Sequence, residues 1–275
     1  MFCLAVGSAA AETLRFNRVS RETIEARLGE YRGTNGVREA TLKRLFVEAG
    51  CGDHLSEQRV IWAEAPNVIC VEPGSSDRVI IVGAHFDRVP RSLGVADNWS
   101  GASLLPSLYQ SIKNEPRQHT YIFIGFTDEE KGLVGSRFYA RHMTREQIAA
   151  TDAMVNMDTL GLAPTEVWTN RSDKSLTRAI GYVAQLINAP ISGLNFEQAG
   201  YSTDSESFGA RKVPRITVHS LTQKSEDTGI LHTSKDKLSA MNLDTYYDTY
   251  HLMALYLVFL DHYFDEPETA TTGTP

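Results

Sequence analysis

The sequence lacks a long apolar run, an excess of basic residues and a rich supply of cysteine. Its longest apolar run, residues 251–260, is half of the ~20 residues that a membrane-spanning helix needs. Asp248 and Asp261 flank this run, so we expect a terminal helix that packs into the core. A net charge of −7 without a stripe of lysine and arginine argues against a nucleic-acid partner.

The three cysteines allow at most one disulfide within the chain. Cys3 lies in a small, apolar N-terminal stretch, and residues 9–11 have the A-x-A form of a signal-peptidase site, although a basic n-region is absent. We interpret residues 1–11 as the remnant of a secretion signal and expect a secreted or periplasmic protein. If that segment is removed, Cys51 and Cys70 remain, either as a disulfide or as two unrelated buried thiols.

Helical and strand patterns alternate over residues 12–265, and we expect the remaining tail, residues 266–275, to be disordered. Short strands separated by helices predict a mixed, mainly parallel α/β sheet with helices on both faces. We expect strands over residues 57–64, 67–74, 78–87, 120–126, 153–161, 165–170 and 214–220, and helices over 20–31, 36–50, 101–114, 136–143, 173–188 and from about 243.

Acidic and imidazole side chains follow several of the predicted strands, where a sheet of this kind binds its ligands. Each one alone has an ordinary explanation, such as capping a turn. Together they would gather like charges in one buried region, where carboxylates raise one another's pKa and cost several kcal/mol unless cations lie among them. The candidates are His85, Asp87, Asp97, Glu129, Glu130, Asp158 and His232.

Imidazoles and carboxylates without a thiolate are typical ligands of zinc, with cobalt or manganese as substitutes. Two histidines and three acids fill two sites if one carboxylate bridges, and paired ions of this type lie ~3.5–4 Å apart with a hydroxide nucleophile between them. Asp87, two residues after His85, is placed to accept the ring N–H. The sequence has no HExxH motif, which excludes the helix-borne type of zinc protease.

Three successive acids, Asp128, Glu129 and Glu130, follow the apolar strand 120–126. Adjacent side chains at a strand end point in different directions. One glutamate can therefore bind metal while its neighbour stays free as a general base over the nucleophilic water. We expect Asp128 to be a solvated or capping acid.

The sequence resembles the co-catalytic di-zinc aminopeptidases, which are bacterial leucyl-type exopeptidases related to glutamate carboxypeptidases and glutaminyl cyclases. The resemblance covers residues from about 78 to 240 and implies the zinc exopeptidase fold. Its five matching segments occur in the family's order: GAHFD (83–87), ADNWSGAS (96–103), FTDEEKGLVGS (126–136), NMDTLG (156–161) and HTSKD (232–236). The spacing of these segments leaves no room for an inserted dimerisation domain, so we expect a single domain.

The resemblance also implies a role for each candidate residue. It implies that Asp97 bridges two zinc ions, that Glu129 is the general base and that Asp87 orients a ligand histidine. The other four ligands are paired by the ion that they bind: His85 with Asp158, and Glu130 with His232.

Substrate contacts are predicted less directly. The segment 199–209 resembles the one that stabilises the tetrahedral oxyanion in the family, which implies Tyr201 as the hydrogen-bond donor and Asp204 as its helper. Trp99 is two residues from Asp97, which leaves open a contact with substrate or ordinary packing. We interpret the remaining histidines as structural or surface residues, since they have no carboxylate at ligand spacing: His54, His119, His142, His219, His251 and His262.

The favoured hypothesis is a zinc-dependent aminopeptidase that binds two Zn²⁺ ions per chain and acts on peptides with a free N-terminus. The alternative is a glutaminyl cyclase, which uses the same scaffold with one zinc ion. The complete set of five ligands favours the hydrolase. A binding module that only kept the scaffold is disfavoured, because the general base and all five ligands are present. The preferred N-terminal residue and the oligomeric state stay open.

Overall fold

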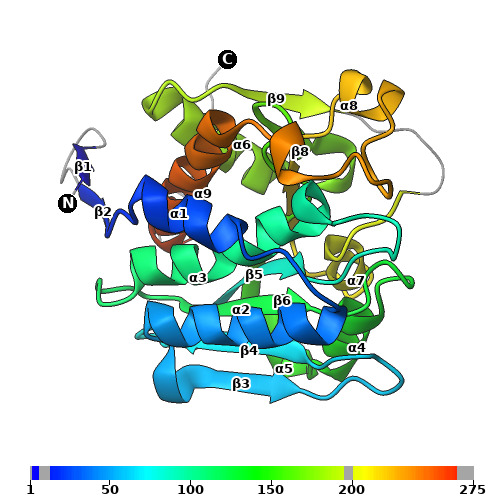
Figure 1. Ribbon diagram of the computed structural model, residues 1–275. Coiled ribbons are helices and arrows are strands. Elements are labelled where there is room, and N and C mark those ends of the chain that lie inside the picture. Colours follow the sequence, from blue (N-terminus) through cyan, green and yellow to red (C-terminus); the bar gives the residue numbers. More distant parts are fainter. Residues whose placement is uncertain (1, 6–12, 195–200, 265–275) are drawn as a thin grey trace.

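The computed structural model describes residues 2–5, 13–194 and 201–264, and its main element is an eight-stranded sheet (Figure 1). The strands are β3 (Leu55–Gln58), β4 (Asn67–Glu72), β5 (Val79–His85), β6 (Thr120–Phe126), β7 (Thr151–Met157), β8 (Thr165–Trp168), β9 (Ile191–Leu194) and β10 (Arg215–His219). Their order across the sheet is β3-β4-β6-β5-β7-β10-β8-β9. The central strands β6, β5, β7 and β10 are parallel, whereas β4 and β8 run antiparallel to the neighbours that join them to this centre.

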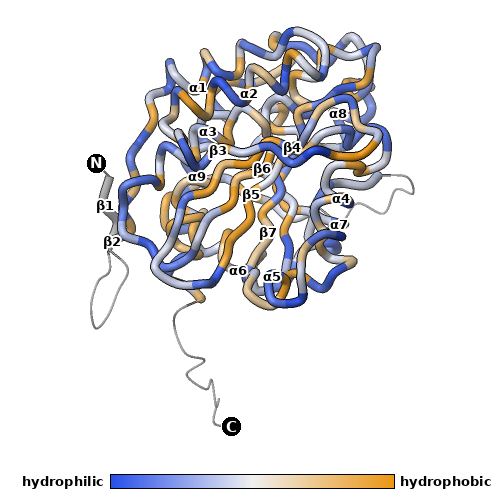
Figure 2. Tube along the Cα trace, turned by 90° about the horizontal axis from the view of Figure 1, so that it is seen from below, coloured by the Kyte–Doolittle hydropathy of each residue, from blue (hydrophilic) through white to orange (hydrophobic). Residues whose placement is uncertain are grey.

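Helices cover both faces of the sheet, as predicted for a single α/β domain. One face packs against α1 (Arg21–Leu28), α2 (Asn35–Ala49), α3 (Ser100–Ile112), α6 (Lys174–Leu186) and α9 (Leu243–Tyr263), and the other against α4 (Val134–His142), α5 (Arg145–Ala150) and α7 (Ser205–Gly209). Successive residues of β5 alternate between the two cores: Ile80 and Val82 pack in the larger, Ile81 in the smaller. Figure 2 shows the apolar character of the central strands that this double burial requires.

Local signals set the helix boundaries that the sequence predicts. The Ser20 hydroxyl caps α1 by accepting the N–H of Thr23 at 3.2 Å. Gly50 ends α2 in the left-handed region, at φ 93°, where a residue without Cβ is least strained. Most of the middle of α9 is buried, which confirms the terminal core helix over residues 251–260. No helix in the described part of the chain combines the length and apolar character needed to span a bilayer.

Two predictions about the strands need correction. The strand expected over residues 57–64 is wrong, because β3 ends at Gln58 and the chain then turns through Trp62, whose φ is 68° and whose side chain is 98% exposed. The hairpin of β1 (Phe2–Ala5) with β2 (Thr13–Phe16) was not expected. Most of the proposed leader and the tail 266–275 lie outside the described residues, so those interpretations stay predictions.

The structure joins Cys51 and Cys70 in a disulfide, which resolves the choice left open by the sequence. The bond links the end of α2 to β4 across a sequence separation of 19 residues. Closure of a loop of this length restricts the unfolded chain, and we expect the double variant Cys51→Ala, Cys70→Ala to lose about 3 kcal/mol of unfolding free energy. Urea unfolding of the variant and of oxidised wild type measures the difference. Equal stability would contradict the disulfide.

Candidate metal centre

The predicted ligands converge at the carboxyl edge of the parallel strands. His85 is the last residue of β5, Asp158 directly follows β7, and Glu130 lies in the turn after β6. Asp97 comes from the segment before α3, and His232 from the loop that follows α8 (Gln223–Asp227). All five line one cavity of about 400 Å³, together with Glu129, Trp168, Tyr201, Thr217 and His219.

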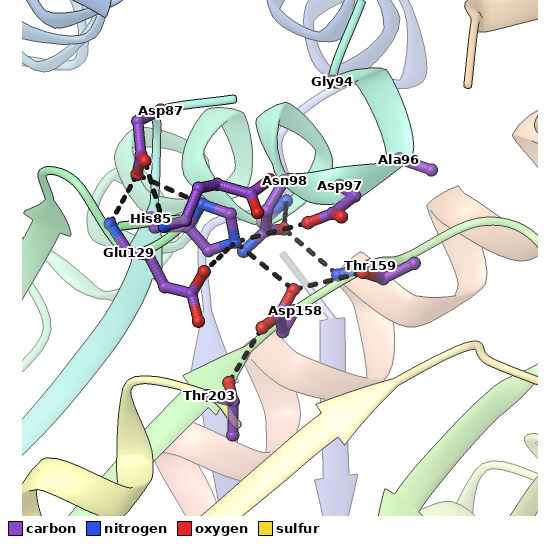
Figure 3. Close-up of polar contacts among 12 residues, drawn as sticks. His85, Asp87, Gly94, Ala96, Asp97, Asn98, Glu129, Asp158, Thr159 and Thr203 are labelled. Atoms are coloured by element: carbon purple, nitrogen blue, oxygen red, sulfur yellow. Dashed lines mark hydrogen bonds and ion pairs between the residues drawn. The ribbon is translucent and has the colours of Figure 1, made fainter. Parts of the chain in front are cut away.

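The first cluster consists of His85, Asp97 and Asp158 (Figure 3). The Nε2 atom of His85 lies 3.4 Å from Oδ1 of Asp97 and 3.6 Å from Oδ1 of Asp158. One ligand atom from each residue lies within 4.8 Å of the others, which suits a single ion. Asp158 is held in place by Thr203, whose hydroxyl donates to Oδ2 at 2.8 Å.

The second cluster shares Asp97 with the first and adds Glu130 and His232. The Nε2 atom of His232 lies 3.2 Å from Oδ2 of Asp97 and 3.0 Å from Oε2 of Glu130. Asp97 therefore turns one carboxylate oxygen toward each histidine, which is the arrangement of a bridging ligand. The structure brings all five predicted ligands together in the pairs that the resemblance implies.

The buried carboxylates of the two clusters repel one another and are stabilised by a nearby positive charge. Burial raises the pKa of both Glu129 and Glu130, and the neighbouring carboxylate of Asp97 raises them further. Hydrogen bonds to Asp97 and Glu130 raise the pKa of His232 to about 10. In the absence of metal, a proton on the imidazole supplies the positive charge that these acids require. The donor set and its charge therefore fit divalent ions such as zinc.

Asp87 fixes the position of the first histidine and of both glutamates. Its Oδ1 atom lies 3.4 Å from Nδ1 of His85 and accepts the backbone N–H of Glu129 at 3.0 Å. Its Oδ2 atom accepts the N–H of Glu130 at 3.2 Å. Glu129 belongs to neither ligand cluster, yet its carboxylate lines the cavity with Oε2 3.9 Å from Nε2 of His85. Glu129 therefore faces the cavity beside the two clusters without being part of either.

We expected Asp128 to be a solvated or capping acid, and its burial excludes the first of these. Its side chain is 1% exposed, and Oδ2 accepts the N–H of Glu64 at 3.3 Å and a hydrogen bond from Nζ of Lys131 at 3.2 Å. The acid thus ties the loop before β4 to the turn that carries the two glutamates. Its role is structural.

Asp236, whose role the sequence did not reveal, organises the loop that carries Asp97. Its carboxylate is fully buried and accepts three backbone N–H groups, from Val95 at 3.1 Å, Ala96 at 2.7 Å and Asp97 at 3.2 Å. The Ser92 hydroxyl also donates to Oδ2, at 3.2 Å. Asp236 lies four residues after His232, so one short segment supplies a ligand and also positions a second.

We expect Asp236→Asn to weaken metal binding by about 10–100-fold, the usual cost of losing a group that orients a ligand. An amide offers one acceptor oxygen where the carboxylate offers two, so part of the N–H set is left unsatisfied and Asp97 loses its orientation. Zinc titration monitored by calorimetry measures the change. Asp173→Asn, at the N-cap of α6 and away from the cavity, is the matched control. Unchanged zinc affinity in Asp236→Asn would contradict this role.

Arg38 supports the same loop from the other side. It is fully buried in α2, and its guanidinium donates to the carbonyl oxygens of Leu93 at 3.1 Å, Gly94 at 3.0 Å and Phe86. Burial lowers its pKa to about 10. An arginine on the apolar stripe of a helix, four residues before Leu42, was the sequence signal for this role.

Trp99 packs in the core next to the site and does not face the cavity. Its side chain is fully buried, its ring lies 5.1 Å from the Arg38 guanidinium, and Nε1 donates to the carbonyl oxygen of Arg27 at 3.0 Å. Of the two possibilities that the sequence left open, the structure shows packing. Trp99 does not line the cavity and is withdrawn as a substrate contact.

Of the segment 199–209, which we expected to contact substrate, residues 199–200 lie outside the described residues. Tyr201 lines the cavity, but Asp204 is fully buried outside its lining, and burial raises its pKa to about 7. Two further lining residues, Trp168 and His219, were not expected there. Trp168 ends β8 and His219 ends β10, the strand that lies between β7 and β8, but nothing in the sequence says that β8 and β10 are neighbours.

Paired acid–imidazole clusters at the carboxyl edge of a mixed α/β sheet are typical of metal-dependent hydrolases. The sequence profile of peptidase family M28 matches residues 67–257, and the chain belongs to this family. Aminopeptidase YwaD of Bacillus subtilis is 33% identical over 140 residues, which are 50% of this chain and 28% of that protein. The probable lipoprotein aminopeptidase LpqL of Mycobacterium tuberculosis is 32% identical over 115 residues, or 41% of this chain and 23% of that protein. The matches thus span about a quarter of these relatives.

Solved structures share the fold and confirm the predicted architecture. The LapA aminopeptidase of Legionella pneumophila superposes with a TM-score of 0.76 at 22% identity, over 88% of this chain and 72% of that one. BSAP, a zinc aminopeptidase of Bacillus subtilis, superposes with a TM-score of 0.64 at 22% identity, over 70% of this chain and 49% of that one. A glutaminyl cyclase of an Acidobacteriales bacterium superposes with a TM-score of 0.75 at 16% identity, over 94% of this chain and 100% of that one. Aminopeptidases and glutaminyl cyclases are both among the structural neighbours, as the resemblance implied.

Proposed function

We propose that the protein is an aminopeptidase that holds two zinc ions and removes N-terminal residues from peptides. The observation that carries the proposal is the position of Asp97, whose two oxygens lie 3.4 Å from Nε2 of His85 and 3.2 Å from Nε2 of His232. One carboxylate between two imidazoles suits a pair of ions that share a ligand. The aminopeptidase names of the relatives support the same activity.

His85 and Asp158 would hold one ion, and Glu130 and His232 the other, with Asp97 between them. When bound, zinc polarises the scissile carbonyl and lowers the pKa of a water molecule. The other steps, proton transfer and stabilisation of the oxyanion, are carried out by side chains of the protein.

Glu129 accepts the proton of the attacking water and passes it to the leaving amine. Burial raises the pKa of Glu129, which makes it a stronger base than an exposed glutamate. Asp87 holds the Glu129 backbone, so the carboxylate stays over the scissile bond. Tyr201 lines the cavity and is our candidate donor to the oxyanion.

The substrates in this proposal are peptides with a free N-terminus. The aminopeptidase names of the relatives support this substrate class, because an aminopeptidase acts at a free N-terminus. We also propose that the protein works outside the cell or in the periplasm. The disulfide between Cys51 and Cys70 supports this location, because such bonds persist in oxidising compartments.

The second candidate function is a glutaminyl cyclase. The likeness to the Acidobacteriales enzyme, which spans 94% of this chain and all of that one, favours it. The presence of two ligand clusters that share Asp97 favours hydrolysis, since the resemblance implies that a cyclase needs only one zinc ion. We therefore place the aminopeptidase first.

A peptide that begins with glutamine separates the two functions. The zinc-loaded protein should release free glutamine and a peptide one residue shorter, which mass spectrometry detects. Ring closure with loss of ammonia would instead identify a cyclase. The same peptide with an acetylated N-terminus should remain intact in either case. Failure to process any member of a panel of unblocked peptides would overturn both functions.

A further inference from the structure

One half of the cavity lining is largely apolar, and one polar group stands out in it. Its walls come from β8, β10, the segment before α7 and the loops after β10: Trp168, Tyr201, Thr217, His219, Leu221 and Leu231. Trp168, Tyr201, Leu221 and Leu231 belong to one apolar cluster. This half is therefore built to enclose a side chain that is largely apolar.

In the His219 ring, Nδ1 is already hydrogen-bonded, whereas Nε2 has no hydrogen-bond partner among the described residues. Its ring is 2% exposed, and Nδ1 accepts the backbone N–H of Leu221 at 3.0 Å. The neutral ring therefore carries its proton on Nε2, which has no hydrogen-bond partner among the described residues. Burial lowers the pKa of His219 to about 4, so the ring stays neutral at physiological pH. By contrast, the Thr217 hydroxyl is hydrogen-bonded to Ser205 at 2.7 Å.

The position of His219 follows from the sheet. The backbone N–H of Asp158 donates to the carbonyl oxygen of Val218 at 2.9 Å, so the residue after Val218 lies beside the metal ligand. The two ligand clusters and Glu129 fix where a scissile bond must lie in the proposed function. The side chain of the first substrate residue is then left with the half of the cavity that contains His219.

We propose that His219 selects substrates whose N-terminal side chain is uncharged and carries an acceptor oxygen at its tip, as in glutamine and tyrosine. This inference rests on the proposed aminopeptidase function. The Nε2–H donor is already buried without a partner among the described residues, which is unfavourable, and an apolar side chain offers it none. An acceptor oxygen supplies the missing hydrogen bond. A lysine or arginine tip has no acceptor to offer.

Two substrate pairs test the inference, because each differs mainly in the acceptor oxygen. Wild type should cleave glutamine anilide better than methionine anilide, and tyrosine anilide better than phenylalanine anilide, in kcat/KM. His219→Phe should lower each ratio by about 10-fold or more, the usual effect of a lost hydrogen bond to substrate. His219→Gln keeps an N–H at the position of Nε2 and should restore most of each ratio. His54→Phe, an exposed site, is the control and should leave both ratios unchanged.

The outcomes separate this inference from the proposed function. Cleavage of the anilides with ratios that His219→Phe and His219→Gln leave unchanged would overturn the role of His219 and leave the aminopeptidase standing. If no anilide is cleaved, the proposed function fails, and calorimetric binding of free glutamine and methionine to the zinc-loaded protein decides the inference. A fall of about 10-fold in the glutamine-to-methionine affinity ratio for His219→Phe supports it, and an unchanged ratio overturns it. Zinc content and thermal unfolding show whether each variant is folded.

Discussion

Glu129→Gln is expected to lower kcat for peptide hydrolysis by about 10³-fold, within the range that a general base contributes. Glutamine has the shape of glutamate but does not take the proton of the attacking water. The backbone N–H of residue 129 still reaches Asp87, so the turn keeps its conformation. Because Glu129 belongs to neither ligand cluster, the variant should retain its zinc. Loss of turnover without loss of metal is the signature of this residue.

Glu130→Gln is the matched comparison, since it changes the neighbouring residue in the same way. The wild-type Glu130 carboxylate lies 3.0 Å from Nε2 of His232. Glu130→Gln should therefore lose zinc from the second cluster as well as activity. Aminoacyl-anilide turnover and elemental analysis of both variants give the two readouts. Wild-type kcat in Glu129→Gln would rule out its role as the base.

Asp97→Ala is expected to remove both ions and to reduce hydrolysis to background. Its carboxylate is the one ligand common to the two clusters, so the substitution leaves two protein ligands for each ion. Two ligands are fewer than the three that catalytic zinc sites normally use. No other single substitution in the set affects both clusters directly.

His232→Ala provides the control, because His232 belongs to the second cluster alone. It should retain about one zinc ion per chain, whereas Asp97→Ala should retain close to none. Metal content after dialysis against a weak chelator measures both. Two zinc ions in Asp97→Ala, or equal losses in the two variants, would contradict a bridging role.

The convergence of the candidate ligands was predictable because their position depends on few assumptions. His85 and Asp158 end two apolar segments, and the carboxyl ends of parallel strands meet at one edge of a sheet. That rule alone brings them together with Glu130. Asp97 and His232 lie on loops, and only the match to known segments assigned them to the same site.

The groups that hold these loops were not predictable, because their partners are backbone atoms far away in the sequence. Asp236 accepts N–H groups from residues 95–97, and Arg38 donates to carbonyl groups near residues 86 and 93. No spacing rule links such pairs. His219 was interpreted as structural or surface because it has no carboxylate at ligand spacing. Its place in the cavity lining depends on the order β7-β10-β8, which the sequence does not specify.

Anomalous diffraction at the zinc edge from crystals of the zinc-loaded protein tests the central claim most directly. We predict two peaks per chain, ~3.5–4 Å apart, one enclosed by His85, Asp97 and Asp158 and the other by Asp97, Glu130 and His232. A single peak, or peaks that do not contact both oxygens of Asp97, would contradict the paired site.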